Sequence, residues 1–255
     1  KPNEIKVIAG RFGIDTERKT LSSIGKDLNL SRERIRQIEK DALKKLASEI
    51  VDKKNSYIET LVDLIVKNGG LVRQEKIAEK FLEDAYKNDK NEFNSLNLIF
   101  FLMPQLKKIE KTRELEESWI LASIKKEELL KIVSDWGTHL EKIKRPVTVD
   151  VLVKENPGHQ KYEMTFLSEL PFVSKKIVKT DNGNIGLASW PEVNPKNVRD
   201  KIYYILKKEG KPVHFNDIAI KINEQNFSKK KIVRATVHNE LIADNRFVLV
   251  GRGIY

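Results

Sequence analysis

Two short amphipathic segments joined by a tight turn, between residues 20 and 46, constrain the fold of this chain more than any other feature. The first segment carries apolar residues at i, i+3 and i+7, which is one face of a helix, at Leu21, Ile24 and Leu28. The second segment carries an apolar stripe at Ile35, Ile38, Leu43 and Leu46. Thr20 and Ser31 each precede a segment, as expected of helix N-caps. The pattern predicts a helix-turn-helix with Asn29 and Leu30 in its turn.

The outer face of the second segment offers side chains that suit contact with DNA bases. These are Arg32, Glu33, Arg36, Gln37, Lys40 and Lys44. In a helix-turn-helix, the N-terminal residues of the second helix lie against base edges in the major groove. Arg can bond guanine through two hydrogen bonds, Gln can bond adenine, and Glu can accept from the cytosine amino group. The alternative is the solvated face of an ordinary helix hairpin, and the pattern alone leaves it open.

About the first 50 residues resemble region 4 of housekeeping-type bacterial sigma factors. The resemblance is carried by Arg11-Phe12-Gly13-Ile14-Asp15, by Thr20-Leu21 with Ile24-Gly25, by the run from Ser31 to Glu39, and by the run from Ala42 to Leu46. It implies that the domain reads a promoter −35 element in double-stranded DNA and docks on the RNA polymerase core, at the flap of the β subunit. It also implies base contacts from Arg32, Glu33 and Gln37, and phosphate contacts from Arg34, Arg36 and Lys40.

The net charge of +11 indicates a polyanionic partner and is confined to the two ends of the chain. Residues 1–50 hold 12 Lys and Arg against 8 Asp and Glu, and residues 195–255 hold 13 against 6. Residues 51–194 hold 23 of each, so the middle is neutral. Basic ends are expected of phosphate-binding domains, whereas a neutral middle is typical of a spacer or a protein-binding module.

The absence of cysteine excludes disulfides and thiolate metal sites, and it fits a reducing cytoplasm. No apolar run approaches the roughly 20 residues of a membrane span. With the resemblance, these observations predict a cytoplasmic, nucleoid-associated bacterial protein with no membrane partner. The chain opens on Lys1 rather than Met, which we take as the sign of a fragment with further sequence upstream. Its oligomeric state has no signal in the sequence.

The remaining 200 or so residues predict one unit repeated three times. Helices are expected at 57–67, 74–81 and 92–103, at 126–143, 149–154 and 162–169, and at 195–209, 215–223 and 230–241. The β-like runs that close the repeats are 106–110 with 119–122, 176–179 with 185–188, and 246–250 with 253–255. Three helices followed by a hairpin is the order of a winged helix, and a generic small α+β domain is the alternative. The predicted fold is therefore mainly α, with a helix-turn-helix at 1–53 and winged-helix (α+β) units at 56–124, 125–193 and 194–255.

The last repeat resembles the HARE-HTH family, through residues 211–219, 233–241 and 247–255. This winged-helix module occurs in chromatin proteins, in restriction endonucleases and in the delta subunit of some bacterial RNA polymerases. The resemblance implies association with transcription or DNA. Basic residues at its third helix and wing predict sequence-neutral phosphate contacts, and a solvated basic face is the alternative. They are Lys229, Lys230, Lys231, Arg234 and Arg252.

No motif for catalysis, a cofactor or a metal is present. The four His residues show no ligand spacing, and there is no phosphate loop or paired nucleophile and base. Trp119, Trp136 and Trp190 are expected in the core, and residues 181–184 form a turn rather than a calcium loop. We therefore expect a non-enzymatic, sigma-like transcription factor. A delta-like polymerase accessory without sequence-specific DNA reading, and a nuclease accessory, are the alternatives.

Overall fold

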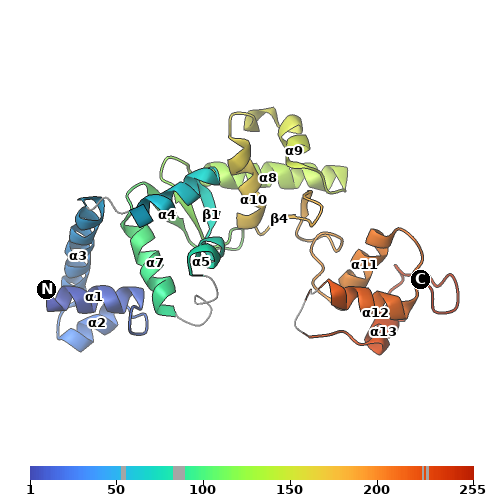
Figure 1. Ribbon diagram of the computed structural model, residues 1–255, viewed down its shortest axis with the longest axis horizontal. Coiled ribbons are helices and arrows are strands. Elements are labelled where there is room, and N and C mark those ends of the chain that lie inside the picture. Colours follow the sequence, from blue (N-terminus) through green and yellow to red (C-terminus); the bar gives the residue numbers. More distant parts are fainter. Residues whose placement is uncertain (53–55, 83–89, 226, 228–229) are drawn as a thin grey trace. The chain divides into compact units, whose positions relative to one another are not determined.

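The structure, a computed structural model, describes residues 1–52, 56–82, 90–225, 227 and 230–255 (Figure 1). It is mainly helical, as the sequence predicts. The chain divides into two compact units, one of residues 1–130 with 162–173 and the other of residues 131–161 with 174–255. The predicted domain boundary at 53–55 and the predicted phosphate contact Lys229 lie outside the described residues. None of the helices in the described ranges is long and apolar enough to cross a membrane.

Three helices form the N-terminal helix-turn-helix module: α1 (Pro2–Phe12), α2 (Leu21–Leu28) and α3 (Arg32–Asp52). Its core is built around the buried residues Val7, Ile24 and Ile35. Gly13 caps the C-terminal end of α1 in the left-handed conformation, at a φ of 74°. Ile5 of α1 is 70% exposed. Val7 lies at the centre of the buried face, and two residues along a helix turn the side chain by about 200°.

The same compact unit contains a three-stranded antiparallel sheet flanked by helices. The helices are α4 (Ser56–Lys67), α5 (Gln74–Leu82) and α7 (Lys90–Leu102), and the strands are β1 (Leu71–Arg73), β2 (Leu106–Ile109) and β3 (Ser118–Leu121). The strands lie in the order β1-β3-β2, with Ile120 of β3 paired to Leu71 on one side and Lys107 on the other. The core gathers Leu61, Phe100 and Trp119, so the predicted burial of this tryptophan is confirmed. Helix α10 (Met164–Val173) packs against β1.

Helix α7 also packs against the helix-turn-helix module. Asp15 and Asn91 exchange two hydrogen bonds: the Asp15 N–H donates to Asn91 Oδ1 at 2.9 Å, and Asn91 Nδ2 donates to Asp15 Oδ1 at 3.0 Å. Asn94 Nδ2 donates to the carbonyl oxygen of Gly13 at 2.8 Å. These side chains hold the loop that follows α1 against α7, so the module and the sheet belong to one compact unit.

Helix α8 (Lys126–Ile143) leads into the second compact unit, and its predicted bounds are confirmed. It is followed by α9 (Val149–Glu155), by the 3-10 helix η1 (Pro157–His159), and by the hairpin of β4 (Ile177–Lys179) and β5 (Ile185–Leu187). The predicted turn between these strands is confirmed, with Gly183 at a φ of 79°. The core centres on Trp136, whose Nε1 donates to His159 Nδ1 at 3.1 Å, while His159 Nε2 lies 3.0 Å from Asp135 Oδ2.

The last part of the second unit holds α11 (Val198–Glu209), α12 (Phe215–Glu224) and α13 (Arg234–Ala243). The predicted start of α13 at Lys230 is wrong. The Asn223 side chain bonds both backbone groups of Ile232, at 2.8 and 2.9 Å, and holds the chain extended until Arg234. The predicted closing strands are reduced to isolated bridges, at which Ile254 pairs with His214 and Gly251.

Candidate nucleic-acid interface

The turn between α2 and α3 fixes the start of α3. Ser31 Oγ accepts from the Arg34 N–H at 3.1 Å, which confirms the predicted cap. The Leu30 N–H donates to the Gly25 carbonyl oxygen at 2.9 Å. The turn passes so close to α2 that a Cβ atom at Gly25 would lie 2.6 Å from the Leu30 carbonyl oxygen. A side chain at this position would therefore force the two helices apart.

The side chains predicted to contact DNA lie on the solvent side of α3. All six are exposed: Arg32, Glu33, Arg34, Arg36, Gln37 and Lys40. Ile35, which lies among them in sequence, is fully buried and packs into the helix-turn-helix core. The structure thus brings the expected base-reading and phosphate-contacting residues together on the first turns of one helix.

Two of the three expected base-reading side chains are bonded to expected phosphate contacts. Arg36 donates to both carboxylate oxygens of Glu33, from Nε at 2.9 Å and from Nη2 at 2.6 Å. Arg34 Nη1 donates to Gln37 Oε1 at 3.2 Å. The hydrogen bonds from Arg36 lower the pKa of the Glu33 carboxyl, so this group stays ionised and remains an acceptor. Arg32 makes no such bond within the described part of the chain.

Arg11 ties α1 to α3, a role that the sequence pattern did not assign to it. Its Nε donates to Glu39 Oε1 at 2.8 Å, and its Nη1 donates to the carbonyl oxygen of Lys19 at 3.0 Å. Both side chains of the Arg11–Glu39 pair are mostly buried. Because the two residues are 28 positions apart, helical spacing gives no signal of the pair.

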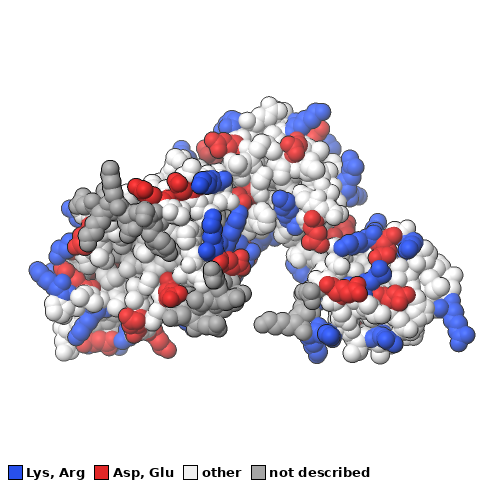
Figure 2. Space-filling model, in the orientation of Figure 1, with Lys and Arg blue, Asp and Glu red and all other residues white. Residues whose placement is uncertain are grey.

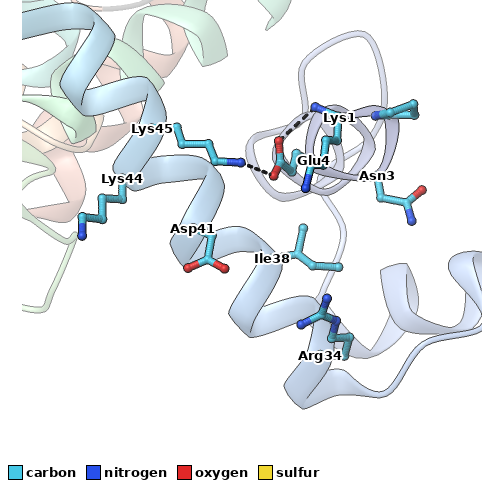
Figure 3. A pocket seen from close by; sticks show the side chains of 9 residues that line it. Lys1, Asn3, Glu4, Arg34, Ile38, Asp41, Lys44 and Lys45 are labelled. Atoms are coloured by element: carbon cyan, nitrogen blue, oxygen red, sulfur yellow. Dashed lines mark hydrogen bonds and ion pairs between the residues drawn. The ribbon is translucent and has the colours of Figure 1, made fainter.

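A shallow hollow of about 660 Å³ lies between the start of α1 and the outer side of α3 (Figure 3). Arg34 and Lys44 line it from α3, and Lys45 reaches across to Glu4 of α1 at 2.6 Å. That hydrogen bond, together with one from the amino group of Lys1, lowers the pKa of Glu4 to about 2. Glu4 therefore stays ionised and neutralises part of the positive charge beside α3.

The basic residues near the last helices that are expected to contact phosphates are also exposed. They come from three different segments of the backbone. Lys230 and Lys231 precede α13, Arg234 is its first residue, and Arg252 lies in the turn before Ile254. A stack of rings joins this turn to α13. The Phe215 N–H donates to the Gly253 carbonyl oxygen at 2.9 Å, and the Phe215 ring lies 4.8 Å from that of His238 on α13.

On the face in Figure 2, acidic and basic side chains are interspersed over each unit. Several of the basic side chains are already paired, as in Arg199–Glu240 and Lys221–Glu209. Among the described residues, no group of three or more acidic or histidine side chains is placed to hold a metal ion.

The helix-turn-helix module matches known proteins. Residues 1–48 match the family model "Sigma-70, region 4". Over 46 residues the chain is 56% identical to RNA polymerase sigma factor SigA of Clostridium acetobutylicum, and over 46 residues it is 61% identical to a probable RNA polymerase sigma-C factor of Synechocystis. Over 47 residues it is 55% identical to RNA polymerase sigma factor RpoD of Helicobacter pylori.

These matches define a sigma region 4-like, DNA-binding class for the N-terminal module. Each covers 18% of this chain, and they cover 12%, 11% and 7% of the three relatives in the order given. No solved structure gives a significant match to the chain. The similarity therefore describes the helix-turn-helix module and does not extend to the sheet-containing units.

Proposed function

We propose that the chain is a sigma-like transcription factor that reads a −35-type promoter element through the start of α3. Arg32, Glu33 and Gln37 contact base edges in the major groove, and Arg34, Arg36 and Lys40 contact the phosphates on either side. The observation that carries this proposal is the exposure of all six residues on one helix face, held by a capped turn. Similarity of the module to three sigma factors supports it.

We also propose a protein-docking surface on the module, between α1 and α3. An apolar groove of about 380 Å³ runs between α1 and α3, lined by Ile5, Ile8, Ala42 and Leu46. Ile5 is largely exposed there, which is typical of a surface that a partner covers. We propose that the RNA polymerase core, at its β flap, is that partner, and that the chain is cytoplasmic and associated with the bacterial nucleoid.

Base reading is tested with Arg32→Ala/Gln37→Ala. Binding is measured to a duplex with a −35-like element and to a scrambled duplex, over a range of salt. Loss of each base contact costs on the order of 1–3 kcal/mol on the first duplex and little on the second. Arg113→Ala/Gln160→Ala, which removes two exposed side chains outside the module, is the matched control. Equal affinity of the wild type for both duplexes would refute base reading.

We further propose that the sheet-containing parts are winged-helix units bounded near 56–124, 125–193 and 194–255, the last of them HARE-HTH-like. The helix, strand, helix, helix, strand, strand order of α4 to β3 supports this assignment. In the last unit, Lys230, Lys231, Arg234 and Arg252 would add sequence-neutral phosphate contacts. They are all exposed, and the ring stack brings the Arg252 turn close to α13.

Phosphate contact by the last unit is tested through the salt dependence of DNA binding. Lys230→Ala/Arg234→Ala should flatten the slope of log K against log salt by up to about 2, since each lost phosphate contact removes about 0.9. Lys196→Ala/Lys211→Ala removes two other exposed lysines of this unit and serves as the control. A slope that both variants leave unchanged would favour a solvated basic face.

The second candidate function is that of a delta-like accessory that binds RNA polymerase without reading sequence. The neutral charge of residues 51–194 favours it, because a neutral surface suits a protein partner better than DNA. Under this alternative, polymerase binding survives Arg32→Ala/Gln37→Ala, and neither duplex is preferred.

A further inference from the structure

The apolar groove between α1 and α3 has a third wall, which comes from α7. Leu98 of α7 lines the groove together with Ile5 of α1 and Leu46 of α3. All three helices belong to one compact unit. The match to sigma region 4 ends at residue 48, so Leu98 comes from a part of the chain outside that match. The groove therefore combines the helix-turn-helix module with a helix of the sheet-containing part.

Helix α7 presents one side to the module and another to the sheet. Asn91, Asn94, Leu98 and Phe101 recur at spacings of three and four residues, which places them along one side of the helix. Phe100 lies outside this stripe and is buried in the core that the sheet shares with its helices. One helix thus supplies both a part of the sheet core and a surface toward the module.

Three members of the stripe hold α7 against the module. Asn91 and Asn94 bond the loop that follows α1. One turn beyond Leu98, the ring of Phe101 meets that of Phe12 of α1 edge to face, with ring centroids 5.5 Å apart. Because these contacts lie on both sides of Leu98 along the helix, they fix the position of this side chain at the groove.

Three of the four charged residues that line the groove are already paired. Glu4 accepts hydrogen bonds from Lys45 Nζ at 2.6 Å and from the amino group of Lys1 at 2.9 Å, as Figure 3 shows. Apart from Glu49, the other lining residues are isoleucine, alanine and leucine. The groove therefore suits an apolar segment of a partner, which it binds by burying side chains rather than by forming ion pairs.

We propose that α7 forms part of the docking surface for the RNA polymerase core, and that Leu98 contacts the same apolar segment of the polymerase as Ile5 and Leu46. This inference rests on the proposed docking of the polymerase in the groove, and it adds a contact from outside the sigma-like module. The lining residues on α3 begin at Ala42, beyond the residues to which we assign DNA contact. Polymerase affinity thus depends on α7, whereas base reading does not.

The test is titration of purified bacterial RNA polymerase core with the full chain, in the absence of DNA. Ile5→Asp and Leu98→Asp are each expected to weaken binding about tenfold or more, because each places a carboxylate in the apolar groove. Val66→Asp is the matched control and should bind like the wild type. Val66 is 51% exposed on α4 of the same compact unit and does not line the groove.

Two further variants separate the loss of this contact from a loss of folding. Leu98→Ala should weaken polymerase binding by about threefold to tenfold, since it removes apolar surface from the groove. Leu98→Met keeps an apolar side chain of similar volume and should bind like the wild type. Slow hydrogen exchange of the amides between Gly13 and Lys19 in both variants would show that α7 stays docked.

The outcomes distinguish the inference from the proposed function on which it rests. Wild-type affinity in the Asp and Ala variants of Leu98, together with a loss in Ile5→Asp, would overturn the role of α7 and leave the docking groove of the module standing. An equal loss in Leu98→Asp and Val66→Asp would also overturn it, because any added charge would then have the same effect. Failure of the wild type to bind the polymerase core would refute both proposals.

Discussion

At the scale of single residues, two side chains on the exposed side of α3, Glu33 and Gln37, already accept hydrogen bonds from neighbouring arginines. Glu33 is bonded to Arg36 and Gln37 to Arg34, so in the free protein an acceptor and a donor are already matched in each pair. In the proposed DNA complex, a base that binds Glu33 or Gln37 therefore competes with a hydrogen bond that the free protein already has. The free energy gained on binding is the difference between the new hydrogen bond to DNA and the bond within α3 that it replaces. This difference depends on the identity of the base.

Gly25 is the residue on which the geometry of the turn depends most. Gly25→Ala is expected to lower the free energy of unfolding by about 1–3 kcal/mol, because the new methyl group would collide with the Leu30 carbonyl oxygen. Denaturant titration measures the loss, and duplex binding should weaken with it. Gly158→Ala is the control, since a Cβ atom there meets no atom within 4 Å. Equal stability of the two variants would contradict the prediction.

Tyr204 provides a prediction at alkaline pH. Burial, together with a hydrogen bond to Asp181 Oδ2 at 2.9 Å, raises the pKa of its phenol from 10.0 to about 12. The folded state favours the neutral phenol, so this contribution to stability is fully present below pH 10 and is lost as the pH rises through 12. Wild type and Tyr204→Phe should show the same rise in phenolate absorbance up to about pH 11. A smaller rise in the variant below that pH would show that Tyr204 ionises normally.

At the scale of secondary-structure elements, local patterns predicted most helices and missed those features that depend on distant residues. The bounds of α8 and the caps at Gly13 and Ser31 follow from periodicity and local hydrogen bonding, which the sequence displays directly. The start of α13 does not follow from a local pattern, because it depends on the Asn223 side chain, which bonds Ile232 nine residues further along the chain. No local pattern predicts the polar cleft that Arg18, Gln74 and Phe101 line, because its lining residues come from segments that only the docking of α7 brings together.

The docking of α7 makes a prediction for hydrogen exchange. In Asn91→Ala/Asn94→Ala, the Asp15 amide loses its acceptor and the Gly13 carbonyl loses its donor. Exchange of the amides between Gly13 and Lys19 should become faster by at least tenfold, whereas amides in the middle of α3 stay protected. Asn245→Ala, at an exposed site, should leave all of these rates unchanged. Unaltered exchange at Asp15 in the double variant would show that α7 does not hold this loop.

At the scale of the whole molecule, the helix-turn-helix module, to which we assign DNA reading, and the buried His159 lie in different compact units. His159→Ala leaves the Trp136 N–H without its acceptor in the core of the second unit, at a cost of about 1–3 kcal/mol before any cavity is counted. Calorimetry should show a lower melting temperature, while discrimination between −35-like and scrambled duplexes stays intact below that temperature. His139→Ala, at a partly exposed site of α8, is the control. Loss of discrimination in His159→Ala would show that the two units are coupled.

Under the proposed function, the Glu33–Arg36 and Arg34–Gln37 pairs of α3 would also separate the search along DNA from recognition of the matching site. The two pairs would stay closed on a duplex of the wrong sequence, and the module would slide along the backbone without desolvating a carboxylate or an amide. A matching sequence would supply partners that open the pairs, and the residence time would then lengthen. Glu33→Gln should leave the sliding rate on non-specific DNA unchanged and shorten only the stay at the matching site. Single-molecule tracking measures both the sliding rate on non-specific DNA and the residence time at the matching site. A change in the sliding rate alone would contradict the prediction.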